Sequence, residues 1–272
     1  MGEDRTAFLE EKAKTVRRDA IDMMRAGGGG WLGGSFSQAD IISALLFQHM
    51  KHDPKRPDWE ERDRLIVSKA HSCETVYSAL AEAGYFSKEE YKRYGQRGAL
   101  LQAHTDRGVP GVEYSGGSLG QGLSFALGQA LVARMGSSTP RYRVFCILGD
   151  GESNEGQVWE AAMAAVHYRV DNLVAFVDHN RFQSSGRVVE RMNDLPLLKR
   201  WDGFGWDAVE IDGHDMSAIL GALERAEGNP GAPHAIIART VKGRGVPEFE
   251  EKNLHFSAIS DEMYEQAMAV LK

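Results

Sequence analysis

The 272-residue sequence has no long apolar run, few cysteines and no excess of basic side chains. No window approaches the run of about 18 apolar residues that a membrane-spanning helix requires. Residues 1–20 are charged throughout, unlike a signal peptide. We therefore expect a cytoplasmic protein that does not associate with membranes.

The scarcity of cysteine also limits the class of protein. Cys73 and Cys146 cannot form a disulfide framework and fit a reducing compartment. Cys146 lies in the apolar run from Val144 to Leu148, which predicts an inert thiol in the core. The net charge of −7 argues against nucleic acid as a partner, whereas an anionic ligand with local contacts remains compatible with it.

The overall composition is that of an ordinary globular domain. Hydrophobic residues make up 42% of the sequence and charged residues 26%, enough for a substantial core. The sequence has no repeat, low-complexity tract or linker. We predict a single domain over residues 1–272, although this length also permits two small ones.

Local patterns predict several helices. Apolar residues recur at helical spacing over residues 5–26, and the pattern stops at the glycine run 27–30. Ser37 is predicted to be the N-cap of a second helix. Ser87 and Glu90 have the spacing of a capping box.

Short β-rich runs alternate with helical patterns, which is typical of an α/β fold. The predicted strands are residues 65–68, 143–148, 173–177, 206–211 and 235–238. A helix over residues 216–226 separates the last two. We predict a mostly parallel sheet flanked by helices on both faces, with ligands beyond the carboxyl ends of the strands.

Two polar residues follow neighbouring predicted strands. Asp150 lies between two glycines after one strand, and Asn180 ends the next strand, thirty positions later. This span fits a strand, a crossover helix and a parallel strand, so both side chains should meet at one edge of the sheet. Carboxylate and amide oxygens suit Mg²⁺, which takes further oxygens from phosphate and water. Capping of turns at the strand ends would also explain both residues.

The segments Gly149–Gly156 and Asp178–Phe182 resemble the thiamine diphosphate motif of transketolases. The resemblance implies a thiamine diphosphate-binding fold with cofactor contacts from both segments: Gly149, Asp150, Gly151, Asn180 and Phe182. It also implies that Asp150, the side chain of Asn180 and the main-chain carbonyl of Phe182 hold Mg²⁺ against the diphosphate.

Earlier segments match the family in the expected order. The sequence Ser68-Lys69-Ala70-His71 resembles Ser-Lys-Gly-His of transketolases, which implies that His71 contacts the diphosphate. His71 also starts a predicted helix, where an imidazole can donate to a phosphate oxygen beside free amides. A histidine that caps the helix or packs in the core would explain this position equally.

Residues 101–121 resemble the family's histidine-containing loop and glycine-rich turn. The resemblance assigns His104 to the hydroxyls of the sugar, and Gly117 and Leu119 to backbone contacts with the cofactor. Ala103 and Thr105 replace the usual Gly and Pro beside the histidine. Close packing of helix and sheet would also account for the glycines.

The family's Lys-Gly-x-Gly segment is similar to Lys242–Pro247, and its later histidine is similar to His255. The sequence around that histidine departs from the family, with Leu254-His255-Phe256 in place of Trp-His-Gly. The resemblance places His255 near the diphosphate and the reacting carbon; a surface histidine on a loop is the alternative. Glu155 and Glu160 are ordinary at a helix start. By resemblance they lie at a subunit interface and relay protons, so His104, His255, Glu155 and Glu160 form the implied catalytic set.

Trp31 is the most informative departure from the family. Gly30-Trp31-Leu32-Gly33-Gly34-Ser35 aligns with a segment that normally reads Gly-His-Ile-Gly-Gly-Ser, whose histidine contacts substrate. Indole has one N–H donor, no acceptor and a larger apolar surface than imidazole. We therefore predict that Trp31 contacts an unusual donor or acceptor rather than the standard pentose phosphates.

The resemblance implies transfer of a two-carbon ketol unit from a ketose to an aldehyde, with thiamine diphosphate and Mg²⁺ as cofactors. A transketolase site also needs a second domain, which binds the aminopyrimidine and supplies a glutamate. The chain has no room for it and ends at Lys272 soon after the last motif, so we expect an α₂β₂ assembly with a C-terminal transketolase-type partner subunit. Two alternatives stay open: decarboxylation of a 2-oxo acid with acyl transfer to a carrier, and a non-catalytic cofactor-binding subunit.

Overall fold

A five-stranded parallel sheet forms the centre of the computed structural model, which describes residues 2–136, 139–192 and 196–272. The strand order is β1-β2-β3-β7-β6, and every neighbouring pair is parallel. The strands are β1 (Arg64–Val67), β2 (Val144–Gly149), β3 (Leu173–His179), β6 (Asp207–Asp212) and β7 (His234–Arg239). The predicted fold class and all five strands are confirmed, with boundaries within two residues.

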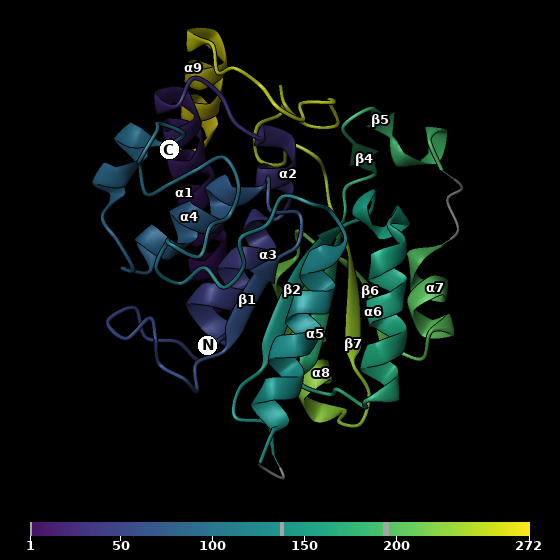
Figure 1. Cartoon of the computed structure of the whole chain (residues 1–272). Helices are drawn as coiled ribbons and strands as arrows, with labels where there is room; N and C mark the ends of the chain where they lie inside the picture. Colours follow the sequence, from purple (N-terminus) through teal and green to yellow (C-terminus); the bar gives the residue numbers. More distant parts are fainter. Residues whose placement is uncertain (1, 137–138, 193–195) are drawn as a thin grey trace.

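Helices cover both faces of this sheet (Figure 1). One face packs against α1 (Gly2–Ala26), α3 (Ala39–Ala44), α4 (Cys73–Glu82) and α8 (Met216–Gly228). The other packs against α5 (Gln121–Arg134), α6 (Gly156–His167) and α7 (Leu197–Gly203). The helices α2 (Leu32–Ser37) and α9 (Asp261–Val270) join α1 in a third apolar cluster.

Most residues of the central strands are apolar because both faces of these strands are buried, and polar residues such as Asp178 and His179 come at the carboxyl end of β3. On β2, Phe145 and Ile147 point to the first helical layer, whereas Cys146 and Leu148 point to the second. Cys146 is a buried free thiol, as predicted, and burial raises its pKa well above the usual value. None of the helices in the described residues is long and apolar enough to cross a membrane.

Two of the predicted helix starts differ in the structure. Ser37 is not an N-cap: it ends α2, and its hydroxyl donates to the buried carboxylate of Asp178 at 2.6 Å. The helix after it begins at Ala39 without a side-chain cap and continues into a π-helical turn over Leu45–His49. Ser87 does cap a helix, but that helix is a short 3₁₀ segment, Lys88–Arg93.

Candidate active site

The carboxyl ends of β2 and β3 bring Asp150 and Asn180 to one edge of the sheet, near β4 (Phe182–Gln183) in Figure 1. Gly149 pairs in register with Asp178, and the amide of Asp150 donates to the carbonyl of Asp178 at 3.3 Å. The backbone N–H of Arg181 donates to a carboxylate oxygen of Asp150. The predicted convergence of the two strand ends is therefore found.

A buried carboxylate, Asp178, holds this edge together. One of its oxygens accepts hydrogen bonds from Lys69 Nζ at 2.6 Å and Asn180 Nδ2 at 3.0 Å. The same oxygen accepts from Ser37, and the other accepts from the hydroxyl of Thr240. Burial alone would raise the pKa of Asp178, but Lys69 and these donors lower it below its usual value. The carboxylate therefore stays charged and fixes four segments of the chain.

A pocket of about 260 Å³ opens above Asp178 at the carboxyl ends of the strands. Its walls include most of the residues predicted to bind cofactor or metal: His71, Leu119, Gly149, Asp150, Gly151, Asn180 and Phe182. Predicted catalytic residues Glu155 and His255 also line it. Residues far apart in the sequence thus converge on one cavity.

The charges around this pocket are incompletely compensated. Burial and the nearby Asp178 raise the pKa of Asp150 to about 7. Burial and the neighbouring Lys69 lower the pKa of Lys242 to about 8. A bound cation would stabilise the ionised form of Asp150, and a bound anion would stabilise the charged form of Lys242. The pocket is therefore suited to an anion and a cation bound together.

Glu152 fixes the loops around the pocket. One of its carboxylate oxygens accepts from the backbone N–H of Gly120 at 2.8 Å and from the hydroxyl of Ser68. The other accepts from the backbone N–H of Gly149 at 3.0 Å. Gly120 adopts a left-handed conformation with φ of 83°, which favours glycine, immediately before α5. The glycine-rich turn therefore has a defined position relative to the end of β2.

Trp31 lies at the centre of a histidine cluster beside the pocket. Its ring makes edge-to-face contacts with His71, His104 and His255, with centroids 5.2, 5.6 and 5.1 Å away. Its Nε1–H donates to the carbonyl of Ala103 at 3.0 Å. The only polar group of the indole is thus engaged, so the ring presents apolar surface to a ligand.

All three histidines of the cluster have lowered pKa values. Burial and Lys69 lower that of His71 to about 3. Burial and Lys242 lower that of His255 to about 4, and burial lowers that of His104. The three imidazoles are therefore neutral near pH 7, and each has one N–H donor and one acceptor nitrogen.

Several predicted residues lie outside the walls of the pocket. His104 reaches it only through the Trp31 cluster, and Gly117 lies on the exposed turn beside His104. Glu155 is the residue before α6, whereas Glu160 is exposed one turn further along and does not line the pocket. The structure thus brings the cofactor set together and leaves Glu160 on the surface.

Four charged residues that shape the site had no role predicted from the sequence: Lys69, Glu152, Asp178 and Lys242. Each of the four lies in a segment that resembles the family, so the position within the motif was a signal from which a role in the site could have been predicted. Their pairing could not be found from sequence, because Lys69 and Asp178 lie 109 positions apart and meet only through the sheet.

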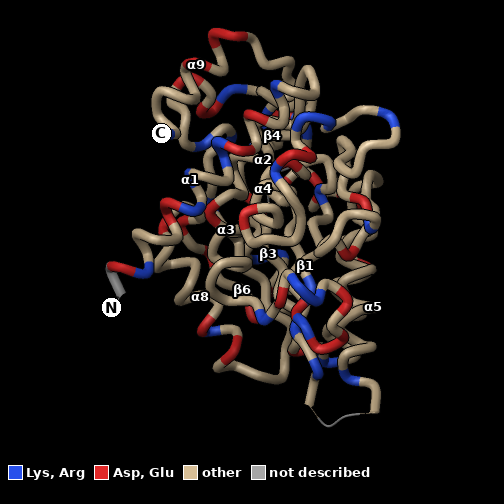
Figure 2. The backbone as a smooth tube through the Cα atoms, turned by 90° about the vertical axis from the view of Figure 1, so that its left-hand side faces the viewer, with Lys and Arg blue, Asp and Glu red and all other residues tan. Residues whose placement is uncertain are grey.

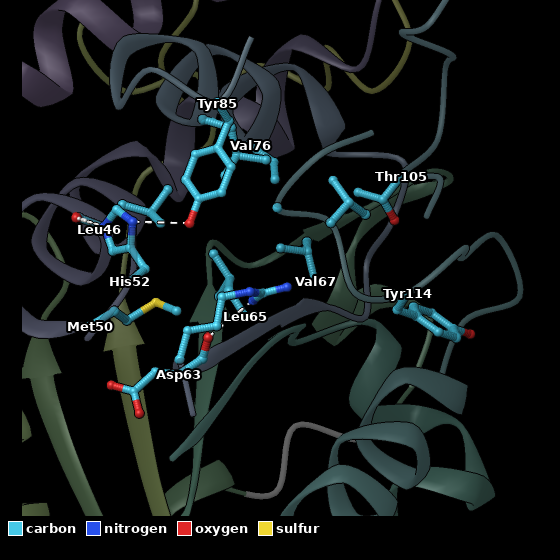
Figure 3. A pocket seen from close by; sticks show the side chains of 14 residues that line it. Leu46, Met50, His52, Asp63, Leu65, Val67, Val76, Tyr85, Thr105 and Tyr114 are labelled. Atoms are coloured by element: carbon cyan, nitrogen blue, oxygen red, sulfur yellow. Dashed lines mark hydrogen bonds between the residues drawn. The ribbon is translucent and has the colours of Figure 1, made fainter. Parts of the chain in front are cut away.

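A different cavity lies beside β1, between α4 and the π-helical turn (Figure 3). Its volume is about 10 Å³, so it has room for no more than about one water molecule. Tyr85 and His52 form a hydrogen bond of 3.0 Å across it. This cavity is therefore too small for a sugar or a cofactor.

The fold and the larger pocket define a domain of the α/β cofactor-binding class, with its ligand site at the carboxyl ends of parallel strands. The family model described as "Transketolase, thiamine diphosphate binding domain" matches residues 9–270. The chain belongs to the transketolase family. This match confirms the resemblance found in the motifs and the assignment of the chain to the transketolase-type transferases.

Curated relatives include the 6-deoxy-6-sulfo-D-fructose transketolase subunit of Clostridium sp., 41% identical over 97% of this chain and 96% of the relative. An apulose-4-phosphate transketolase subunit of Phocaeicola vulgatus is 36% identical over 96% of this chain and 92% of the relative. The solved transketolase of Campylobacter jejuni superposes with a TM-score of 0.91 at 33% identity. The chain covers 42% of that protein, so it corresponds in length to the subunits.

Proposed function

We propose that this chain, as one α/β domain, is the cofactor-binding subunit of a two-component transketolase that moves a two-carbon ketol unit from a ketose to an aldehyde. The pocket above Asp178 is the observation that carries the proposal, because buried Lys69 and Lys242 meet Asp150 and Asn180 there. Two cations beside a hard-oxygen donor pair suit a diphosphate bound through a metal ion.

Mg²⁺ is proposed to bind Asp150, the side-chain oxygen of Asn180 and the main-chain carbonyl of Phe182. The described residues contain no cluster of three or more His, Cys, Asp or Glu side chains that could hold a metal. The proposed set has only one carboxylate, so the diphosphate and water would have to complete the coordination shell. Metal and cofactor should therefore bind together.

Thiamine diphosphate supplies the carbanion chemistry of this enzyme class when it is bound. The protein residues have simpler tasks. Lys69 and Lys242 offset the negative charge of the diphosphate, and His71 donates a hydrogen bond to it. His104 and His255, both neutral near pH 7, are placed to orient hydroxyl groups of the sugar and to exchange protons with them.

The donor is proposed to be other than a standard pentose phosphate. Trp31 takes the position of a substrate-binding histidine, but its N–H is held by Ala103 and its ring is surrounded by imidazoles. It cannot hydrogen-bond to a hydroxyl as a histidine would. Relatives named for 6-deoxy-6-sulfo-D-fructose and apulose 4-phosphate are consistent with specialised donors in this group.

A partner subunit is proposed to supply the aminopyrimidine site and a catalytic glutamate in an α₂β₂ assembly. Relatives of matching length are named as transketolase subunits, which supports a divided enzyme. Glu155 and Glu160 lie at the start of α6, where both are exposed and accessible to another chain. We assign them to the interface and to proton relay.

Co-expression of the chain with the product of the neighbouring reading frame tests the proposal. The purified complex should turn over ketose donors only with thiamine diphosphate and Mg²⁺, whereas neither subunit should be active on its own. Asp150→Asn should abolish turnover, and Asp202→Asn, an exposed substitution, should leave it unchanged. Turnover of 2-oxo acids alone would reject ketol transfer, and cofactor binding without turnover of either donor class would indicate a non-catalytic subunit.

A further inference from the structure

Another cavity lies at the carboxyl ends of β3, β7 and β6, beside Thr240, whose hydroxyl donates to Asp178. Its volume is about 320 Å³. It is lined by His179, Arg181, Asp212, His214, Arg239, Thr240, Val241 and Arg244. Parallel α/β sheets bind ligands at this edge, and the proposed function assigns this cavity no role.

Three arginines and one acidic residue, Asp212, line the cavity. The guanidinium of Arg181 is already paired with Glu251 at 2.5 Å, so the donors for a ligand are those of Arg239 and Arg244. Arg239 lies 3.7 Å from the carboxylate of Glu210, and Arg244 lies 3.5 Å from that of Glu250. Within the residues that the structure describes, neither guanidinium donates a hydrogen bond. Ion pairs this long and this exposed contribute little, so both groups keep donors for a ligand.

The walls of the cavity are fixed before any ligand binds. His214 Nδ1 contacts a carboxylate oxygen of Asp40 at 2.7 Å, and its Nε2 accepts from the backbone N–H of Val241 at 2.8 Å. Thr240 donates to Asp178, and the backbone of Arg181 donates to Asp150. A preorganised wall lowers the entropic cost of binding.

Guanidinium groups bind tetrahedral oxyanions through paired N–H donors. Acidic and basic residues are interspersed along the chain, whose net charge is −7 (Figure 2). The lining of this cavity, in contrast, has three arginines and one acidic residue, Asp212. We propose that this cavity binds a phosphoryl group or another tetrahedral oxyanion of a small molecule. The site is separate from the diphosphate pocket and does not depend on the proposed reaction.

Titration calorimetry with inorganic phosphate, and separately with sulfate, tests this proposal at constant ionic strength. The full chain is first saturated with thiamine diphosphate and Mg²⁺, so that the diphosphate pocket does not contribute. Arg239→Gln combined with Arg244→Gln should weaken phosphate binding by at least about tenfold, because each charged donor contributes strongly to anion binding. Arg93→Gln with Arg97→Gln removes the same charge from an exposed segment and should change binding by less than about twofold.

Equal weakening by the two double variants would show that net charge, rather than this cavity, attracts the anion, and would overturn the proposal. The absence of saturable phosphate and sulfate binding to the wild-type chain would overturn it as well. Arg239→Lys with Arg244→Lys keeps the charge but removes the paired donors, so it should bind more weakly than wild type. Thermal unfolding of each variant checks that the fold is retained.

Discussion

The buried ion pair between Lys69 and Asp178 allows a quantitative test of how the candidate active site is held together. The two side chains are 3% and 0% exposed, and they are 2.6 Å apart. Asp178→Asn keeps the shape of the side chain but removes its charge. Lys69 would then lose its negatively charged partner and keep neutral oxygen acceptors such as the carbonyl of Gly34, at 2.8 Å.

An uncompensated buried charge costs about 3–5 kcal/mol. The free energy of unfolding of a typical domain is about 5–15 kcal/mol. Asp178→Asn should therefore remove a large fraction of the stability, measured by urea unfolding with tryptophan fluorescence as the probe. Asp202→Asn, an exposed control, should change the free energy of unfolding by less than about 0.5 kcal/mol.

A double-mutant cycle with Lys69→Met completes the test. Each single substitution leaves one buried charge without its partner, but the double variant leaves neither. The double variant should therefore cost less than the sum of the two single variants, by about 0.5–3 kcal/mol. Strict additivity, or a cost for Asp178→Asn as small as that of Asp202→Asn, would refute this account of the site.

Three further predictions concern substrate choice, backbone conformation and pH. Trp31→His should shift turnover toward standard ketose phosphates, measured as kcat/KM for each donor, and an unchanged preference would count against the proposed role. Gly243→Ala should lower the free energy of unfolding by more than about 1 kcal/mol, because φ at Gly243 is 78° and a Cβ there would lie 2.4 Å from the carbonyl oxygen of Phe249. Gly221→Ala should not lower it, because a Cβ at Gly221 in α8 would meet open space. Burial lowers the pKa of His49 from 6.5 to about 4, so the folded state binds fewer protons than the unfolded state between these pH values. The free energy of unfolding should therefore fall as the pH drops from 6.5 toward 4. His49→Gln should lessen that fall, measured by urea titrations at several pH values.

The strands and the meeting of Asp150 with Asn180 could be predicted from sequence because both depend on local signals. A buried parallel strand is a continuous apolar run, and a right-handed crossover places successive strand ends on one edge. The prediction that Ser37 is an N-cap was wrong because the local sequence suits a helix cap, whereas the hydroxyl donates to Asp178, 141 positions away. The partners of a buried charge depend on the whole fold, so no local pattern could indicate them.

Asp178 links the candidate active site to the arginine-lined cavity. One of its carboxylate oxygens accepts a hydrogen bond from Lys69, which lines the candidate active site. Its other carboxylate oxygen accepts from Thr240, which lines the arginine-lined cavity. Loss of its charge should therefore disturb both cavities, whereas loss of Arg239 and Arg244 removes donors from one cavity and leaves this network intact. The two sets of variants thus separate ligand contacts from the network that positions them, because only the Asp178 variants should change stability and both binding reactions together.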